Sequence, residues 1–262
     1  MGAVEATTCV RYSGGAWAGE PTLVPRENPL TIYVNGREMA TVLCTPVNMN
    51  FLVVGFLYSE GLIQSIKDVT TIRVCDDEQE ADVRLAHQVS LPAPRVLTSG
   101  CGGAPAGRHA ESPVSSDLTV SPALVQSLMK QLLETAGTHR EYGGLHTSAL
   151  GDESGLVAVA EDIGRHNTLD KIQGECLLRG IATRDRVLLS TGRMSSEMIG
   201  KAARMGVPVV VSRSATTDRA IALADKLGIT AIGYARGERF TVYSHPQRVR
   251  AQEQGMACSH RR

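Results

Sequence analysis

The spacing of apolar residues in the second half of the chain is typical of an α/β domain. The expected strands are residues 156–160, 186–190, 207–212 and 229–234, and the expected helices between them are residues 167–179, 196–204 and 217–227. Each strand is a short apolar run, and each helix carries an apolar stripe with a period of 3.6. Strict alternation of strands and helices predicts βαβ crossovers, and therefore a mostly parallel sheet with ligand-binding loops at its carboxyl edge.

The first half has a different pattern, which predicts a smaller β-rich domain over residues 28–115. Asn35 and Gly36 separate two strand-like segments, and this dipeptide favours the positive φ angles of a tight hairpin turn. The apolar residues of segment 48–58 predict a largely buried helix. Segment 69–90 predicts two short strands around an acidic turn. The fold class is thus α/β in the second domain and α+β for the whole chain.

The remaining segments are irregular in pattern, apart from one helix. Residues 1–27 are rich in Gly, Thr and Pro and are expected to be a lead-in segment without regular structure. Residues 91–117 form a long Pro/Gly/Ser/Ala-rich loop, a type that is uncommon in compact proteins unless it is functional or disordered. Ser121 and Pro122 then start a helix as N-cap and N1 residues. The α/β domain is expected to span residues 116–249, with a basic tail over residues 250–262.

Composition and charge exclude several classes of protein. The 262 residues are 42% hydrophobic with a formal net charge of zero, so no overall positive field attracts nucleic acid. The six cysteines have no paired spacing, which favours a reducing compartment over a disulfide scaffold. The N-terminus has no signal-peptide pattern, and no apolar run approaches the ~20 residues of a membrane span. We expect a cytoplasmic protein that binds neither nucleic acid nor membrane.

Polar residues gather where the expected strands of the second domain end. Four successive loops there carry arginine beside a helix N-terminus, a combination that suits an anionic ligand such as a phosphate ester. One such arginine is commonly a surface charge, but four together favour a ligand site. Two histidines stand near these loops and could donate hydrogen bonds or protons near neutral pH. The candidate ligand residues are His146, Arg165, His166, Arg193, Ser195, Arg213, Ser214, Arg236 and Arg239.

Cys101 is the candidate nucleophile. It lies between Gly100 and Gly102 in the long loop, where neither helical nor strand periodicity explains a buried thiol. A thiol on such a loop could accept a group at one site and deliver it at another. The alternative is an exposed cysteine without chemistry. The other cysteines are interpreted as buried apolar residues or as tail residues: Cys44, Cys75 and Cys176 in the first group, Cys9 and Cys258 in the second. No zinc, P-loop or Gly-x-Ser-x-Gly pattern occurs, so no metal ligands are expected.

Short motifs in a fixed order resemble the formate dehydrogenase accessory sulfurtransferases, the FdhD family. They cover about residues 26–249. The motifs are Arg26-Glu27-Asn28-Pro29-Leu30, Gly55-Phe56-Leu57-Tyr58-Ser59-Glu60-Gly61, Gly100-Cys101-Gly102, Gly143-Gly144-Leu145-His146-Thr147, Glu161-Asp162-Ile163-Gly164-Arg165-His166-Asn167, Ser195-Ser196-Glu197-Met198, Val211-Ser212-Arg213-Ser214-Ala215, Gly233-Tyr234-Ala235-Arg236 and Val242-Tyr243-Ser244-His245-Pro246.

The resemblance implies a sulfur carrier. Members accept sulfur from a cysteine desulfurase as a persulfide, here on Cys101, and deliver it to the molybdenum cofactor, Mo-bis-molybdopterin guanine dinucleotide, which formate dehydrogenase then receives. It also implies a cytidine-deaminase-like second domain without zinc, and a homodimer. The stretch that matches the family's cofactor-binding segment consists of Ala235, Arg236, Gly237, Glu238, Arg239 and Phe240.

This chain departs from the family pattern in the cysteine loop. Many members carry Cys-x-x-Cys there, whereas the second position here is Ala104. A relay between two loop thiols is therefore impossible, and one cysteine must carry the sulfur. Two other functions remain open at this point. One is a chaperone that binds a guanine nucleotide or the molybdopterin cofactor without covalent chemistry. The other is a deaminase-like hydrolase, against which the missing zinc ligands argue.

Overall fold

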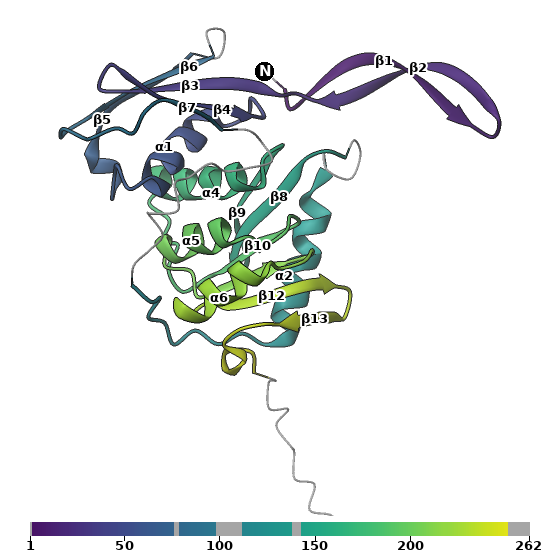
Figure 1. Ribbon diagram of the computed structural model, residues 1–262. Helices are drawn as coiled ribbons and strands as arrows, with labels where there is room; N and C mark the ends of the chain where they lie inside the picture. The colour runs from purple at the N-terminus through teal and green to yellow at the C-terminus, as the bar shows by residue number, and fades with distance from the viewer. Residues whose placement is uncertain (1, 76–78, 98–111, 138–142, 251–262) are drawn as a thin grey trace, which may run out of the picture.

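The computed structural model describes residues 2–75, 79–97, 112–137 and 143–250. It shows a mixed α/β protein with a five-stranded sheet, a six-stranded sheet and a projecting two-stranded hairpin (Figure 1). Within these described parts, no helix has both the length and the apolar composition needed to cross a bilayer. The helices of the two sheet-containing parts meet in the middle of the molecule (Figure 1).

The five-stranded sheet forms the N-terminal part. Its strand order is β5-β6-β3-β4-β7, and its strands are β3 (Asn28–Val34), β4 (Arg37–Cys44), β5 (Val69–Cys75), β6 (Glu80–Leu85) and β7 (Arg95–Leu97). The turn between β3 and β4 has positive φ at Asn35 (51°) and Gly36 (78°), which confirms the predicted hairpin. The two strands expected over residues 69–90 are also confirmed, while the acidic turn at 76–78 lies outside the described residues. A 3₁₀ turn, Ile66–Asp68, precedes β5.

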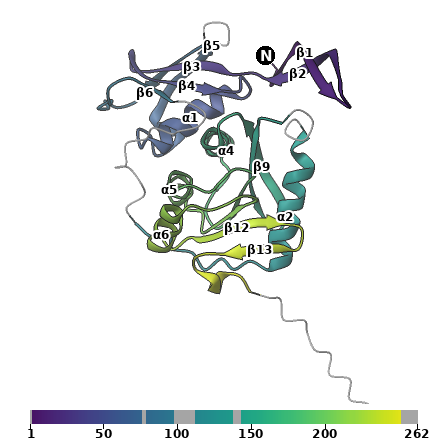
Figure 2. The ribbon, with the colours of Figure 1, turned by 45° about the vertical axis from the view of Figure 1, so that its right-hand side comes forward.

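The six-stranded sheet forms the C-terminal part. Its strand order is β13-β12-β11-β10-β8-β9, with β8 (His146–Asp152), β9 (Gly155–Asp162), β10 (Val187–Ser190), β11 (Val209–Ser212), β12 (Thr230–Arg236) and β13 (Arg239–Val242). Helices α4 (Arg165–Arg179), α5 (Ser196–Arg204) and α6 (Asp218–Lys226) cover one face, and α2 (Pro122–Thr135) covers the other (Figure 2). A final 3₁₀ turn is Pro246–Arg248. Ser121 caps α2 through a bond from the Leu124 backbone N–H, as predicted.

The prediction of a mostly parallel sheet is wrong. Within the described six-stranded sheet, β10–β11 and β11–β12 pair in parallel, whereas β8–β9, β8–β10 and β12–β13 pair antiparallel. The sequence reading missed β8 and β13. Each of them is joined to its neighbour by a short turn, and strands joined in this way must run antiparallel.

Helices α1 (Met49–Ser59) and α4 cross at glycines and thereby join the two parts. A Cβ atom added at Gly55 would overlap the backbone carbonyl of Asp170, and one added at Gly174 would overlap the carbonyl of Phe51. Neither glycine has a positive φ, so the small residue is needed for close approach of the backbones rather than for an unusual backbone conformation. The helix expected at residues 48–58 is confirmed by α1.

A buried polar network fixes the end of β4 to the start of α4. The carboxylate of Asp162 is fully buried and pairs with the Lys171 ammonium at 2.6 Å. It also accepts hydrogen bonds from the backbone N–H groups of Thr45 (3.0 Å) and Gly164 (2.8 Å), and from the Asn167 side-chain amide (2.8 Å). The charges are therefore paired and bonded, as burial requires.

The first residues form a hairpin arm in place of the irregular lead-in expected from the sequence. Strands β1 (Val4–Ser13) and β2 (Ala16–Pro25) pair antiparallel over their full length and project away from both sheets (Figures 1 and 2). Gly14 (φ 59°) and Gly15 (φ 87°) make the turn at its tip. Cys9, expected in a tail, lies in β1.

Candidate functional site

The carboxyl ends of β9, β10, β11 and β12 lie at one edge of the six-stranded sheet. The last three are parallel neighbours, and β9 has the same direction because β8 lies antiparallel to both β9 and β10. The start of β8 reaches the same edge. Backbone bonds join the loops there, from Arg213 N–H to Ser190 O (2.9 Å), from Met194 N–H to Ala215 O (2.9 Å), and from Tyr234 N–H to the Ser214 carbonyl (3.0 Å). The loops thus form one continuous surface.

Exposed arginines stand on this edge. Arg193, Arg213, Arg236 and Arg239 are all solvent-exposed. The Arg236 Nε donates to the backbone carbonyl of Arg213 at 3.0 Å, and its guanidinium carbon lies 5.8 Å from the centre of the Tyr234 ring. These two contacts orient one guanidinium across the β11 and β12 loops. Its terminal nitrogens suit the paired oxygens of a phosphate.

His146 and Arg165 meet at Gly192, next to the exposed Arg193. A Cβ atom at Gly192 would lie 3.0 Å from the Arg165 Cβ and 3.2 Å from the His146 Nδ1. Both side chains are half-buried. A glycine in the β10–α5 loop therefore lets a histidine and an arginine from two other elements approach the same point of the edge.

His166 is buried and neutral. Its Nε2 lies 3.1 Å from the Ser195 hydroxyl and 3.5 Å from the Glu197 carboxyl. Burial, together with the positive charges of Lys201 and Arg165, lowers the pKa of His166 to about 2, so the contact with Glu197 is not an ion pair. Burial also raises the pKa of Glu197. His166 therefore acts as a neutral hydrogen-bonding residue at neutral pH.

The two candidate serines have local structural partners. The Ser195 hydroxyl caps α5 by accepting from the Met198 backbone N–H (3.4 Å), in addition to its contact with His166. The Ser214 backbone N–H donates to the Ser212 hydroxyl at 2.9 Å. Both residues shape the loops, and each is half-buried at the edge.

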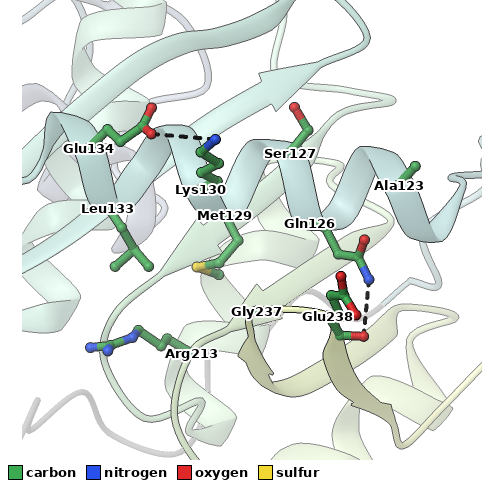
Figure 3. Close-up of a pocket in the computed structure, with 10 residues that line it drawn as sticks. All are labelled: Ala123, Gln126, Ser127, Met129, Lys130, Leu133, Glu134, Arg213, Gly237 and Glu238. Atoms are coloured by element: carbon green, nitrogen blue, oxygen red, sulfur yellow. Dashed lines mark hydrogen bonds and ion pairs between the residues drawn. The ribbon is translucent and has the colours of Figure 1, made fainter.

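An open groove of about 910 Å³ lies beside this edge, between α2 and the loops after β11 and β12 (Figure 3). Gln126, Met129 and Leu133 point from α2 toward the side on which Arg213 lies (Figure 3). The Gln126 amide donates to the Glu238 carbonyl at 3.1 Å and closes one end. The complete lining is Ala123, Gln126, Ser127, Met129, Lys130, Leu133, Glu134, Arg213, Gly237 and Glu238.

The segment singled out through the family resemblance divides between core and surface. Ala235 is buried, and Phe240 packs against the same apolar cluster, so their side chains face the protein interior. Gly237 (φ 57°) and Glu238 form the exposed turn between β12 and β13 and line the groove. Within this segment, the side chains offered to a ligand are those of Arg236, Glu238 and Arg239.

Cys101 lies outside the described residues. Of the described cysteines, Cys44 and Cys176 are buried, and burial raises their pKa to about 12 and about 11. They remain protonated and suit packing rather than nucleophilic chemistry. Cys9 and Cys75 are half-buried in β1 and β5, outside the six-stranded sheet. The described residues contain no group of three or more His, Cys, Asp and Glu side chains arranged for a metal ion.

The sequence reading missed two contributions to the site. The α2 wall was not foreseen, although Gln126, Lys130 and Glu134 recur at four-residue intervals on a predicted helix and so share a face. The buried ion pair of Asp162 and Lys171 was also not predicted. Nothing in one sequence reports that a charged pair nine residues apart lies in the interior.

Comparisons with known proteins agree on one family. The model of the FdhD/NarQ family matches residues 25–250. "Sulfur carrier protein FdhD" of Bacillus subtilis is 40% identical, over 92% of this chain and 95% of its own length. The protein of the same name in Staphylococcus haemolyticus is 39% identical, over 95% and 98%.

A solved structure has the same fold. It is the crystal structure of a protein assigned as a formate dehydrogenase accessory protein in Desulfotalea psychrophila, with a TM-score of 0.81 and 26% identity. The match covers 95% of this chain and all of that one. Sequence and fold agree over nearly the whole length, and this chain therefore belongs to the FdhD/NarQ family.

Proposed function

We propose that this protein is a sulfur carrier in the maturation of formate dehydrogenase, with Cys101 as the sulfur-bearing residue. The observation that carries the proposal is near-complete alignment with relatives named sulfur carrier proteins. The motif Gly100-Cys101-Gly102 adds a cysteine without bulky neighbours in the sequence. The two buried cysteines are poor alternatives because their thiols stay protonated.

The loading step is a sulfur exchange. The Cys101 thiolate attacks the terminal sulfur of a persulfide on a cysteine desulfurase, and the S–S bond of the donor breaks as the new S–S bond forms. The donor leaves as a thiolate, and Cys101 holds the transferred sulfur as a persulfide. Electrons balance without an added oxidant or reductant. With Ala104 in place of a second cysteine, the sulfur stays on one residue until it is delivered.

The acceptor is Mo-bis-molybdopterin guanine dinucleotide, which this protein binds as a substrate. Its pyrophosphates suit the exposed arginines Arg193 and Arg213, whose loops lead into the capped starts of α5 and α6, and Arg236, which is bonded to the Arg213 carbonyl. The groove beside Arg213 is large enough for a nucleotide-sized group and has an apolar wall of Met129 and Leu133. His146 and Arg165 would contact the ligand from the floor of the same edge.

The remaining partners follow from this role. A cysteine desulfurase supplies the sulfur, and formate dehydrogenase receives the cofactor, in the cytoplasm. The protein works as a homodimer. Its second part has the deaminase-like fold without the zinc.

Mass spectrometry tests the sulfur step. Wild type incubated with a cysteine desulfurase and cysteine is expected to gain one sulfur that reductant removes, and Cys101→Ser is expected to gain none. Cys75→Ser is the matched control, because Cys75 is accessible but lies on the other sheet. A reductant-sensitive adduct retained in Cys101→Ser would overturn the assignment. Full restoration of formate dehydrogenase activity by Cys101→Ser would favour the non-covalent chaperone.

Nucleotide binding tests the edge separately. We expect Arg236→Ala to weaken binding of a guanine nucleotide, used as a fragment of the acceptor, by about tenfold or more, since a bond to a charged group contributes roughly 1.5–3 kcal/mol. Arg84→Ala is the control, because Arg84 is exposed on the five-stranded sheet. Unchanged binding in Arg236→Ala would remove the β12 loop from the ligand site.

A further inference from the structure

Tyr234 is held in a backbone conformation that a bulky residue rarely adopts. Its φ is 52°, in the left-handed region, where the Cβ atom crowds the backbone. Most of the other described non-glycine residues with positive φ are Asn, Asp or His, the types that adopt this conformation most readily. The conformation therefore costs free energy at Tyr234, and strain of this kind is concentrated at functional sites.

A β-bulge in β12 produces this conformation and turns the Tyr234 ring toward solvent. Between its paired residues Gly233 and Arg236, β12 has two residues, whereas the facing segment of β13 has one. Tyr234 is 46% exposed, although the residues on either side of it are buried. Glycine is the usual residue at the left-handed position of such a bulge and would fit there without strain. The exposed ring thus has no packing role that accounts for its cost.

The surrounding structure fixes the backbone beside Tyr234. A Cβ atom at Gly233 would lie 2.8 Å from the Thr216 Oγ1 and 2.9 Å from the Tyr243 Cε2, so the strand is packed closely against its neighbours at this point. The Tyr234 N–H also donates to the Ser214 carbonyl at 3.0 Å. The ring is therefore presented from a rigid part of the strand rather than from a loose loop.

The Tyr234 ring lies among the exposed arginines of the edge. The Arg236 guanidinium carbon is 5.8 Å from the centre of the ring, and the Arg236 Nε donates to the Arg213 carbonyl at 3.0 Å. Arg213 directly precedes Ser214, whose carbonyl accepts the Tyr234 N–H. One aromatic ring and two guanidiniums consequently stand at the same point of the surface.

We propose that the guanine ring of the acceptor stacks on Tyr234, while Arg213 and Arg236 hold its pyrophosphate. This assignment rests on the acceptor proposed above. An exposed aromatic ring beside exposed guanidiniums matches the two parts of a nucleotide, because bases stack on aromatic side chains and phosphates pair with arginine. The guanine is the ring assigned, because the pterin end of the acceptor holds the molybdenum, which has to stay accessible to the incoming sulfur.

Two probes separate the ring contact from the phosphate contacts. Guanosine diphosphate carries both parts, inorganic pyrophosphate carries only the phosphates, and calorimetry on the full-length protein measures both dissociation constants. We expect Tyr234→Leu to weaken binding of guanosine diphosphate by about tenfold and to change pyrophosphate binding by less than about twofold. Tyr234→Phe keeps a ring and is expected to bind both probes as wild type does. Tyr33→Leu is the matched control, because Tyr33 lies in β3 of the other sheet.

The possible results lead to different conclusions. Equal weakening of both probes in Tyr234→Leu would mean that the ring only positions Arg236, which would refute the stacking contact. If Tyr234→Leu matches wild type for both probes while Arg236→Ala weakens both, the ring assignment fails and the acceptor site stands. If wild type binds neither probe, the acceptor site fails and this assignment fails with it. Weakening of hydroxymethylpterin diphosphate but not of guanosine diphosphate would give the ring to the pterin and exclude the guanine.

Proton NMR of bound guanosine diphosphate tests the contact in the wild-type protein, without relying on the folding of a variant. A base that stacks on an aromatic ring has its ring proton shifted to higher field by the ring current. We expect this shift with wild type and Tyr234→Phe, and its loss in Tyr234→Leu. Absence of the shift when the nucleotide is bound to wild type, or its persistence in Tyr234→Leu, would overturn the proposal.

Discussion

Asp162→Asn is predicted to destabilise the protein strongly, although Asp162 belongs to the motif that suggested ligand binding. The substitution removes the charge that pairs with Lys171 at 2.6 Å and places an amide where the carboxylate accepts three further hydrogen bonds. Lys171 is 2% exposed and would remain as a buried ammonium, bonded only to the carbonyls of Thr45 and Glu161. Breaking one side of a buried pair costs about 3–5 kcal/mol. That loss approaches the whole stability of many domains, about 5–15 kcal/mol.

Urea denaturation measures this free energy, with the slope of the unfolding curve as a check on two-state behaviour. Asp82→Asn is the control, because Asp82 pairs with Arg84 at 3.4 Å on the surface and its loss should cost about 0–1 kcal/mol. Asp162→Asn/Lys171→Met removes both charges and should be more stable than Asp162→Asn alone. The buried ion pair of Asp162 and Lys171 does not stabilise the protein as described if the free energy of unfolding of Asp162→Asn lies within about 1 kcal/mol of the wild-type value. The same conclusion follows if adding Lys171→Met lowers that free energy further.

Two further predictions concern the same junction and the site. Gly174→Ala should lower the free energy of unfolding by about 2 kcal/mol or more in the same assay, because its Cβ would overlap the Phe51 carbonyl and this overpacking outweighs the roughly 1 kcal/mol gained in helix propensity. Gly137→Ala is the control and should be close to neutral, because the added Cβ atom meets no other atom within 4 Å. Equal stabilities of the Gly174→Ala and Gly137→Ala variants would argue against the close crossing of α1 and α4. His166 has a folded-state pKa of about 2, far below its unfolded value near 6.5, so protons bind the unfolded chain first and stability falls as pH drops below about 6.5. Between pH 7 and pH 5.5, wild type should lose about 1 kcal/mol more than His166→Gln, and parallel losses in the two proteins would refute a buried neutral imidazole.

Much of the fold could be predicted from one sequence because local signals agree with tertiary structure. Asn35 and Gly36 specify their hairpin turn through backbone preference alone, and Ser121 specifies the start of α2 through its hydroxyl. The direction of β8 could not be predicted in the same way. Its polar and small residues disguise a buried strand, so the short turn that sets its direction relative to β9 was not predicted either, and its partner β10 is distant in sequence.

In the candidate site, too, some features follow from local sequence patterns and others depend on contacts between distant residues. The strand-end loops place arginines on one edge because the carboxyl ends of equally directed strands meet there, which periodicity can indicate. Asp162 is buried partly through its hydrogen bond with the Thr45 backbone, which is 117 residues away in the sequence, and no local sequence pattern indicates that contact. The sequence did not predict the arm because Thr, Gly and Pro interrupt its apolar residues, and Val10, Tyr12 and Trp17 are exposed rather than buried in a core of the described residues.

The glycine crossing of α1 and α4 also determines how the chain can be divided in the laboratory. The boundary between the two sheets falls in the segment between β7 and α2, which invites expression of the halves as separate proteins. Each half would then expose the face of α1 or α4 that packs closely against the other helix at Gly55 and Gly174. Each half would also expose one partner of the buried hydrogen bond between Thr45 and Asp162. Separate halves are thus expected to aggregate when made alone and to recover a soluble complex when co-expressed. The experiment should therefore measure whether the two co-expressed halves form a soluble complex, rather than whether one half alone is active.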